Sequence, residues 1–180
     1  MANEYLIHKW RLWFDALDVK KDGVLSREDV TEEEDKFAHL HHFGAEKRKD
    51  IIGKLDKWWD QYIFRGKSGP ITVQEYIDMQ NNDFKEDKEK YTKWAEECAK
   101  TIFDILDIEH DGTITQEEFL IAFRSAGHEN VKLDKDFFNA YDPKDGKVTV
   151  KKMVDTWVTF LTSEDSSQPD IIKDAFEGGL

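Results

Sequence analysis

Residues 102–123, IFDILDIEHDGTITQEEFLIAF, hold the most informative pattern in the chain. Apolar residues recur at helical spacing on both sides of a short acidic segment, which predicts a helix, a turn and a second helix. A glycine in the turn allows a positive φ, so the backbone can reverse sharply there. The positions that define the turn are Asp107, Glu109, Asp111, Gly112, Ile114 and Glu118.

This spacing matches the EF-hand loop over residues 107–118, with Glu109 where the pattern has Asp or Asn. Ca²⁺ takes about six to eight oxygen ligands, and alternating side chains on a turning backbone can reach one point. A chance acidic turn and a loop that has lost its ion are the alternatives, but the number of matching positions favours a Ca²⁺ site. The candidate ligands are Asp107, Glu109, Asp111, the carbonyl oxygen of Thr113 and the bidentate carboxylate of Glu118, with Thr115 acting through water.

A second copy of the pattern, in WFDALDVKKDGVLSREDV, places a loop at residues 18–29. Asp18 and Asp22 match the acidic positions. The third position is Lys20, whose positively charged side chain cannot bind a cation. The last position is Asp29, one methylene shorter than Glu, which favours Mg²⁺ relative to Ca²⁺. Two interpretations stay open. The loop is structural and holds no metal, or Lys20 turns outward and water takes its place.

Two further copies lack most of the acidic positions, and we interpret them as scaffold. The residues that replace the ligands are Phe64, Gly66 and Ser68 in the loop at 64–75, and Tyr141, Pro143 and Lys152 in the loop at 141–152. The eighth residue of each loop is apolar and suited to pairing with a neighbouring loop. We therefore expect Leu25 to pair with Ile71, and Ile114 with Val148.

Composition limits the classes of partner. The 180 residues carry 26 Lys and Arg against 39 Asp and Glu, a formal net charge of −13, which argues against nucleic acid and anionic membranes. Aromatic residues make up 13% of the chain, which predicts a large aromatic core. A single cysteine, Cys98, excludes an internal disulfide, and no catalytic motif is present. We expect a cytoplasmic protein that is not an enzyme, binds metal ions and is monomeric.

The order of the copies predicts an all-α protein, in which four EF-hand units in two pairs pack into one compact globule. The first pair is assigned to residues 1–85, and the second pair, with a C-terminal tail, to residues 86–180. Residues 31–56 are interpreted as a charged, partly helical connection, and 81–100 as a polar connection that leads into the next helix.

Two smaller segments also carry expectations. The charged run Thr31–Lys36 is interpreted as a solvated helix face. The segment SSQPD, residues 166–170, is expected to end the last long helix, so that the apolar residues of 171–180 dock back onto the body.

Four copies, a lengthened first pair, a second loop without ligands and the ending DAFEGGL together resemble the invertebrate sarcoplasmic calcium-binding proteins. The resemblance covers nearly the whole chain. It implies a compact helical fold and a Ca²⁺/Mg²⁺ buffer in the cytoplasm. It also implies that the third loop binds Ca²⁺ and that the first loop is the next site, through Asp18, Asp22, the backbone of Val24 and Asp29.

Calexcitin and the coelenterazine-dependent photoproteins and binding proteins share this architecture, so two alternatives follow. In a photoprotein-like protein, Trp157 and Phe176 would stand where that family's reactive His and Tyr are expected, which disfavours luminescence. A calexcitin-type signalling module is one alternative function. A sensor would open on binding Ca²⁺ and expose a Met-rich groove. The chain has only 3 Met but 6 Trp, which favours a buffer or a closed signal carrier.

Overall fold

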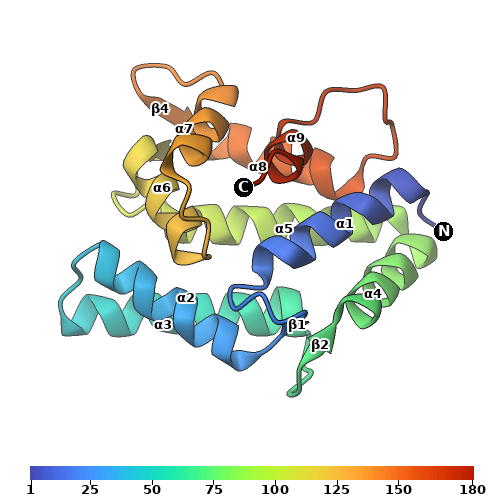
Figure 1. Cartoon of the computed structure of the whole chain (residues 1–180), viewed down its shortest axis with the longest axis horizontal. Helices are drawn as coiled ribbons and strands as arrows, with labels where there is room; N and C mark the ends of the chain where they lie inside the picture. The colour runs from blue at the N-terminus through green and yellow to red at the C-terminus, as the bar shows by residue number, and fades with distance from the viewer.

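The computed structural model describes residues 1–180, and most of them are helical, as the sequence predicts. The elements in chain order (Figure 1) are α1 (Glu4–Leu17), β1 (Val24–Leu25), α2 (Arg27–Leu40), α3 (Ala45–Trp58), the π-helical segment η1 (Trp59–Phe64), β2 (Ile71–Thr72), α4 (Val73–Glu86), α5 (Lys88–Leu106), β3 (Thr113–Thr115), α6 (Gln116–Ser125), α7 (Val131–Ala140), β4 (Lys147–Thr149), α8 (Val150–Thr162) and α9 (Ile171–Glu177). None of these helices combines the length and the apolar character that crossing a bilayer requires.

The short strands join the loops in pairs. β1 is antiparallel to β2, with Leu25 opposite Ile71, and β3 is antiparallel to β4, with Ile114 opposite Val148. This confirms the pairing predicted from the eighth loop positions. All four side chains are buried, so each pair of loops is held both by backbone hydrogen bonds and by apolar contact.

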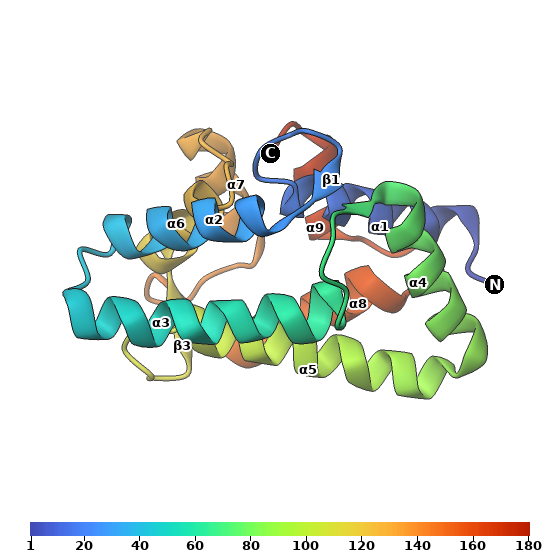
Figure 2. The ribbon, with the colours of Figure 1, turned by 90° about the horizontal axis from the view of Figure 1, so that it is seen from below.

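The two pairs of hands share one hydrophobic core of 41 buried residues. Several helix contacts join them: α2 packs against α6, α3 and α4 against α5, and α1 against α8 and α9. Figure 2 shows α2 and α3 lying side by side, with α3 running along α5. The expectation that the halves pack on each other is therefore confirmed.

The C-terminal tail folds back as predicted. α8 ends at Thr162, and after a loop the chain forms α9, whose Ile172 and Phe176 are buried against the body. The side chain of Asp170 accepts a hydrogen bond from the backbone N–H of Lys173 and so caps α9. The same carboxylate lies 3.2 Å from the fully buried ammonium of Lys9 on α1, which ties the two ends of the chain together.

Two expectations about connecting segments need correction. Residues 81–100 are not a polar connection, because α4 continues to Glu86 and α5 begins at Lys88, with only Asp87 between them. The run Thr31–Lys36 is not a wholly solvated face, because Glu34 is only 5% exposed. α3 packs against α2 and covers this side chain, and local charge patterning cannot reveal such a tertiary contact.

Candidate metal centre

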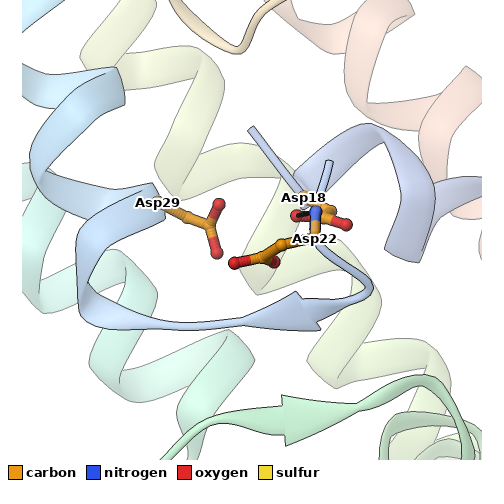
Figure 3. Close-up of side chains that lie close together, drawn as sticks. All are labelled: Asp18, Asp22 and Asp29. Carbon is orange, nitrogen blue, oxygen red and sulfur yellow. Dashed lines mark hydrogen bonds between the residues drawn. The ribbon is translucent and has the colours of Figure 1, made fainter. Parts of the chain in front are cut away.

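The first loop brings three carboxylates together. Asp18, Asp22 and Asp29 each offer an oxygen, and these oxygens all lie within 4.8 Å of one another (Figure 3). Asp18 ends α1, Asp29 lies in the first turn of α2, and Asp22 lies in the turn between them. Asp18 and Asp29 are buried and Asp22 is exposed, so the cluster has one open side. This arrangement is suited to a hard divalent cation.

Backbone amides hold the two buried aspartates in position. Asp18 accepts the N–H of Gly23 at 2.8 Å, while Asp29 accepts the N–H groups of Lys20 at 2.9 Å and Ser26 at 2.8 Å. Burial raises the pKa of Asp18, and hydrogen bonds from the backbone of Gly23 and Asp22 partly oppose that rise. The carboxylates are therefore placed by the fold before any ion arrives.

Lys20 is paired outside this cluster. Its ammonium forms an ion pair with Glu28 in the first turn of α2, and this contact raises the pKa of Lys20. The lysine is therefore turned outward, as metal binding in this loop would require, and metal binding itself stays a prediction. The third loop position is then left for water.

The third loop has the same backbone frame. Asp107 accepts the N–H of Gly112 at 2.8 Å, as Asp18 accepts that of Gly23 in the first loop. Glu118 accepts the N–H groups of Ile108 at 2.8 Å and of Thr115 at 2.9 Å, so its carboxylate faces back into the loop from the first turn of α6.

The carboxylates of the third loop are nevertheless less closely gathered than those of the first, because no three of them meet within 4.8 Å. The Oδ2 atom of Asp111 lies 3.0 Å from the ammonium of Lys147 in β4. Its Oδ1 atom accepts a hydrogen bond from the Thr113 hydroxyl at 2.8 Å. The Thr113 hydroxyl, followed by Lys147, lowers the pKa of Asp111 to about 2. Glu109 is exposed. The sequence ranks the third loop first, whereas the structure gathers the first loop's ligands more tightly.

A capping box accompanies the ninth and twelfth positions of three loops. The carboxylate at the twelfth position accepts the backbone N–H of the ninth residue in all three loops, and the threonine side chains at the ninth position of the second and third loops accept the N–H of the twelfth residue. The pairs are Ser26 with Asp29, Thr72 with Glu75, and Thr115 with Glu118. The twelfth carboxylate therefore begins the helix after the loop as well as facing the candidate site.

The fourth loop replaces this carboxylate with a cation. The ammonium of Lys152 donates a hydrogen bond to the backbone carbonyl oxygen of Tyr141, which joins the twelfth position of the loop directly to the first. A bound ion would make this connection in an active loop. Sequence reasoning identified Lys152 as incompatible with metal but did not foresee that it closes the loop itself.

Sequence reasoning also missed the left-handed backbone conformation at the fourth position of both acidic loops. Lys21 and His110 have left-handed φ values of 56° and 54°, followed two residues later by the positive-φ glycines Gly23 and Gly112. The turn therefore needs two left-handed residues, and only the glycine is visible as a signal in the sequence.

Comparison with known proteins agrees with this geometry. A family model described as EF hand matches residues 11–31 and 99–121, which contain the whole of the first and third loops. A sarcoplasmic calcium-binding protein from Mizuhopecten yessoensis is 37% identical over 175 residues, covering 97% of this chain and 99% of that protein. This chain belongs to the sarcoplasmic calcium-binding protein family.

Two solved structures share the fold of this sarcoplasmic calcium-binding protein. The coelenterazine-binding protein of Renilla muelleri matches with a TM-score of 0.79 and 23% identity, over 98% of this chain and 96% of that one. The sarcoplasmic calcium-binding protein of amphioxus matches with a TM-score of 0.66 and 16% identity, over 98% of both chains.

This family member also contains a partly open apolar pocket of about 110 Å³, lined by residues from both halves of the chain. Its walls include Trp13, Trp58, Phe103, His128, Trp157 and Phe176. Trp157 and Phe176, the two positions compared above with the photoproteins, thus lie on one cavity wall and belong to the packed core.

Proposed function

We propose that this protein is a calcium-binding protein that buffers Ca²⁺ and Mg²⁺ in the cytoplasm, as a monomer. The observation that carries the proposal is the carboxylate cluster of Asp18, Asp22 and Asp29, which stands in an EF-hand loop and has its lysine turned away. The same backbone frame recurs in the third loop. Two divalent sites are thereby supported.

The two loops are suited to different ions. The third loop closes with Glu118, whose length permits bidentate binding and the higher coordination number that Ca²⁺ prefers. The first loop closes with Asp29, which suits the six-coordinate geometry of Mg²⁺. The proposed ligands are Asp107, Glu109, Asp111, Thr113 and Glu118 in the third loop, and Asp18, Asp22, Val24 and Asp29 in the first.

Several features support a buffer instead of a switch. The shared core joins both pairs of hands, and opening one pair would expose large aromatic side chains. The exposed large apolar side chains are only Met1 and Val131, which supports a monomer without a ready-made groove for a target helix.

The coelenterazine-binding alternative is not favoured. The apolar pocket measures about 110 Å³, which is smaller than the roughly 150 Å³ of a cavity that binds benzene. A ligand of several rings would require the core to rearrange.

Calorimetric titration of the metal-free protein with Ca²⁺, with and without Mg²⁺, tests the proposal. We expect one Ca²⁺ site that Glu118→Gln removes, and a second site, occupied by Mg²⁺ at millimolar concentration, that Asp29→Asn removes. Glu75→Gln is the matched control, because Glu75 has the same loop position and capping box in a loop without acidic ligands. Unchanged Ca²⁺ stoichiometry in Glu118→Gln would contradict the site assignment.

A further inference from the structure

The third and fourth loops exchange more than backbone hydrogen bonds. Lys147 begins β4, and its backbone lies opposite Thr115 of β3 in the antiparallel pair. From this place its ammonium crosses to the third loop and lies 3.0 Å from the Oδ2 atom of Asp111. The two-stranded pairing fixes where this side chain starts, so the contact belongs to the paired state of the loops.

The ammonium of Lys147 faces the acidic side of the third loop. Its hydrogen bond to Asp111 places the positive charge of a fourth-loop lysine directly beside a candidate ligand of the third loop. The Lys147 side chain is 44% exposed, so solvent and salt partly screen the attraction.

Lysines near the other loops have different partners. Lys20 is drawn away from the first loop by Glu28, and Lys152 is held by the carbonyl oxygen of Tyr141 inside the fourth loop. Lys144, close to Lys147 in the same loop, pairs with Asp142. Among these lysines, Lys147 alone has its ammonium hydrogen-bonded to a candidate metal ligand.

We propose that Lys147 is an affinity-determining residue for the third loop, acting as an internal counter-ion that weakens Ca²⁺ binding. This inference rests on the function proposed above. If the ammonium stays beside Asp111 when the ion binds, it repels the ion. If it leaves, the ion pair between Lys147 and Asp111 is lost, and that loss offsets part of the free energy of binding. Both routes lower the affinity, and the fourth loop thereby tunes its neighbour without binding metal itself.

Calcium titration of Lys147→Gln at low ionic strength tests the proposal. We expect the dissociation constant of the third site to fall by about three- to tenfold relative to the unmodified protein. The difference should shrink in 1 M KCl, because salt screens an exposed charge. Lys147→Arg should keep the original affinity, since it preserves the charge.

Lys144→Gln is the matched control, because it removes the same charge from the same loop at a lysine paired with Asp142. An equal gain in Lys144→Gln and Lys147→Gln would overturn the proposal, since net charge would then explain it. A Ca²⁺ affinity that is unchanged or lower in Lys147→Gln would overturn it as well. Failure of the underlying function is distinguished by Glu118→Gln: if that variant keeps the full Ca²⁺ stoichiometry, the third loop is not the site.

Discussion

The twelfth loop position shows how one residue sets the role of a whole hand. Asp29 and Glu118 face candidate metal sites, Glu75 only caps its helix, and Lys152 closes its loop by contacting a backbone carbonyl. The first and third loops share a backbone path, with left-handed residues at the fourth and sixth positions, whereas the second and fourth loops place their left-handed residues differently. A loop of this kind is closed either by a bound cation at its centre or, as in the fourth loop, by a lysine contact that takes the place of the cation.

A buried acid outside the loops makes the stability of the fold depend on pH. Asp134 on α7 is fully buried, and neither carboxylate oxygen has a hydrogen-bond partner. Burial raises the pKa of Asp134 to about 6. In the unfolded chain this carboxyl ionises near its usual pKa of about 4, so the folded state binds more protons between about pH 4 and pH 6. The contribution of Asp134 to stability therefore decreases as pH rises through this window.

We predict that Asp134→Asn stabilises the metal-free protein at pH 7 by about 1–3 kcal/mol, because the amide cannot ionise. Below pH 4 the variant and the original protein should be equally stable, since the carboxyl is protonated in both states. Urea unfolding at a series of pH values measures the difference. A stability difference that does not vary with pH would show that ionisation is not the cause.

At the level of elements, α9 depends on a buried ion pair. The helix is short, and the residue that caps it, Asp170, also neutralises Lys9 on α1. Burial lowers the pKa of Lys9, and the neighbouring Asp170 opposes that effect. A buried charge without its partner is strongly unfavourable, whereas removing both charges together is often tolerated.

We predict that Asp170→Asn destabilises the protein by about 3–5 kcal/mol, although asparagine can still cap α9. The double variant Lys9→Met/Asp170→Asn should recover most of that loss. Chemical denaturation of both single variants and the double variant gives the coupling energy. Equal destabilisation in Asp170→Asn and in the double variant would mean that the loss arises from packing or capping and not from the unpaired Lys9.

At the level of the whole molecule, the two pairs of hands are not independent. The end of α1 rests against the connection between α6 and α7, because His128 contacts the carbonyl oxygen of Ala16 on α1 at 3.3 Å. At Gly127, which has a φ of 93°, an added Cβ would approach the carbonyl oxygen of Val19 to 3.4 Å. A loop of the first pair is thus fitted closely against the second pair.

We predict that the protein unfolds in a single transition despite its two pairs of hands. Thermal unfolding followed by far-ultraviolet circular dichroism and by tryptophan fluorescence should coincide, because the core is shared. Free Ca²⁺ at one hundred times the dissociation constant should add about 2.7 kcal/mol of stability, which a chelator removes. Two separated transitions would contradict the single cooperative core.

The same core gives a prediction about exposed apolar surface. Adding Ca²⁺ to the metal-free protein should cause little change in the fluorescence of the dye ANS, because a buffer hand barely opens. A large increase that depends on Ca²⁺ would identify a sensor and would contradict the proposed buffer. Glu118→Gln, in which the third site is removed, provides the control for any signal from dye binding alone.

The loops themselves were largely predictable from sequence, for a local reason. Ligand positions, turn glycines and helix starts all lie within twelve consecutive residues, so their spacing encodes the hairpin-like path directly. The pairing of Leu25 with Ile71 and of Ile114 with Val148 followed from the same spacing and is confirmed.

The sequence by itself thus determined the helical fold class, the two acidic loops, the pairing of the loops and the family to which the chain belongs. Only the tertiary structure decided that Lys20 turns toward Glu28, that Lys147 reaches Asp111, and that Glu34 is buried. The physical reason is that charge acts through space. Whether a lysine blocks a site, leaves it free or tunes it depends on which carboxylate the fold places nearest, and residues far apart in the chain can supply that carboxylate.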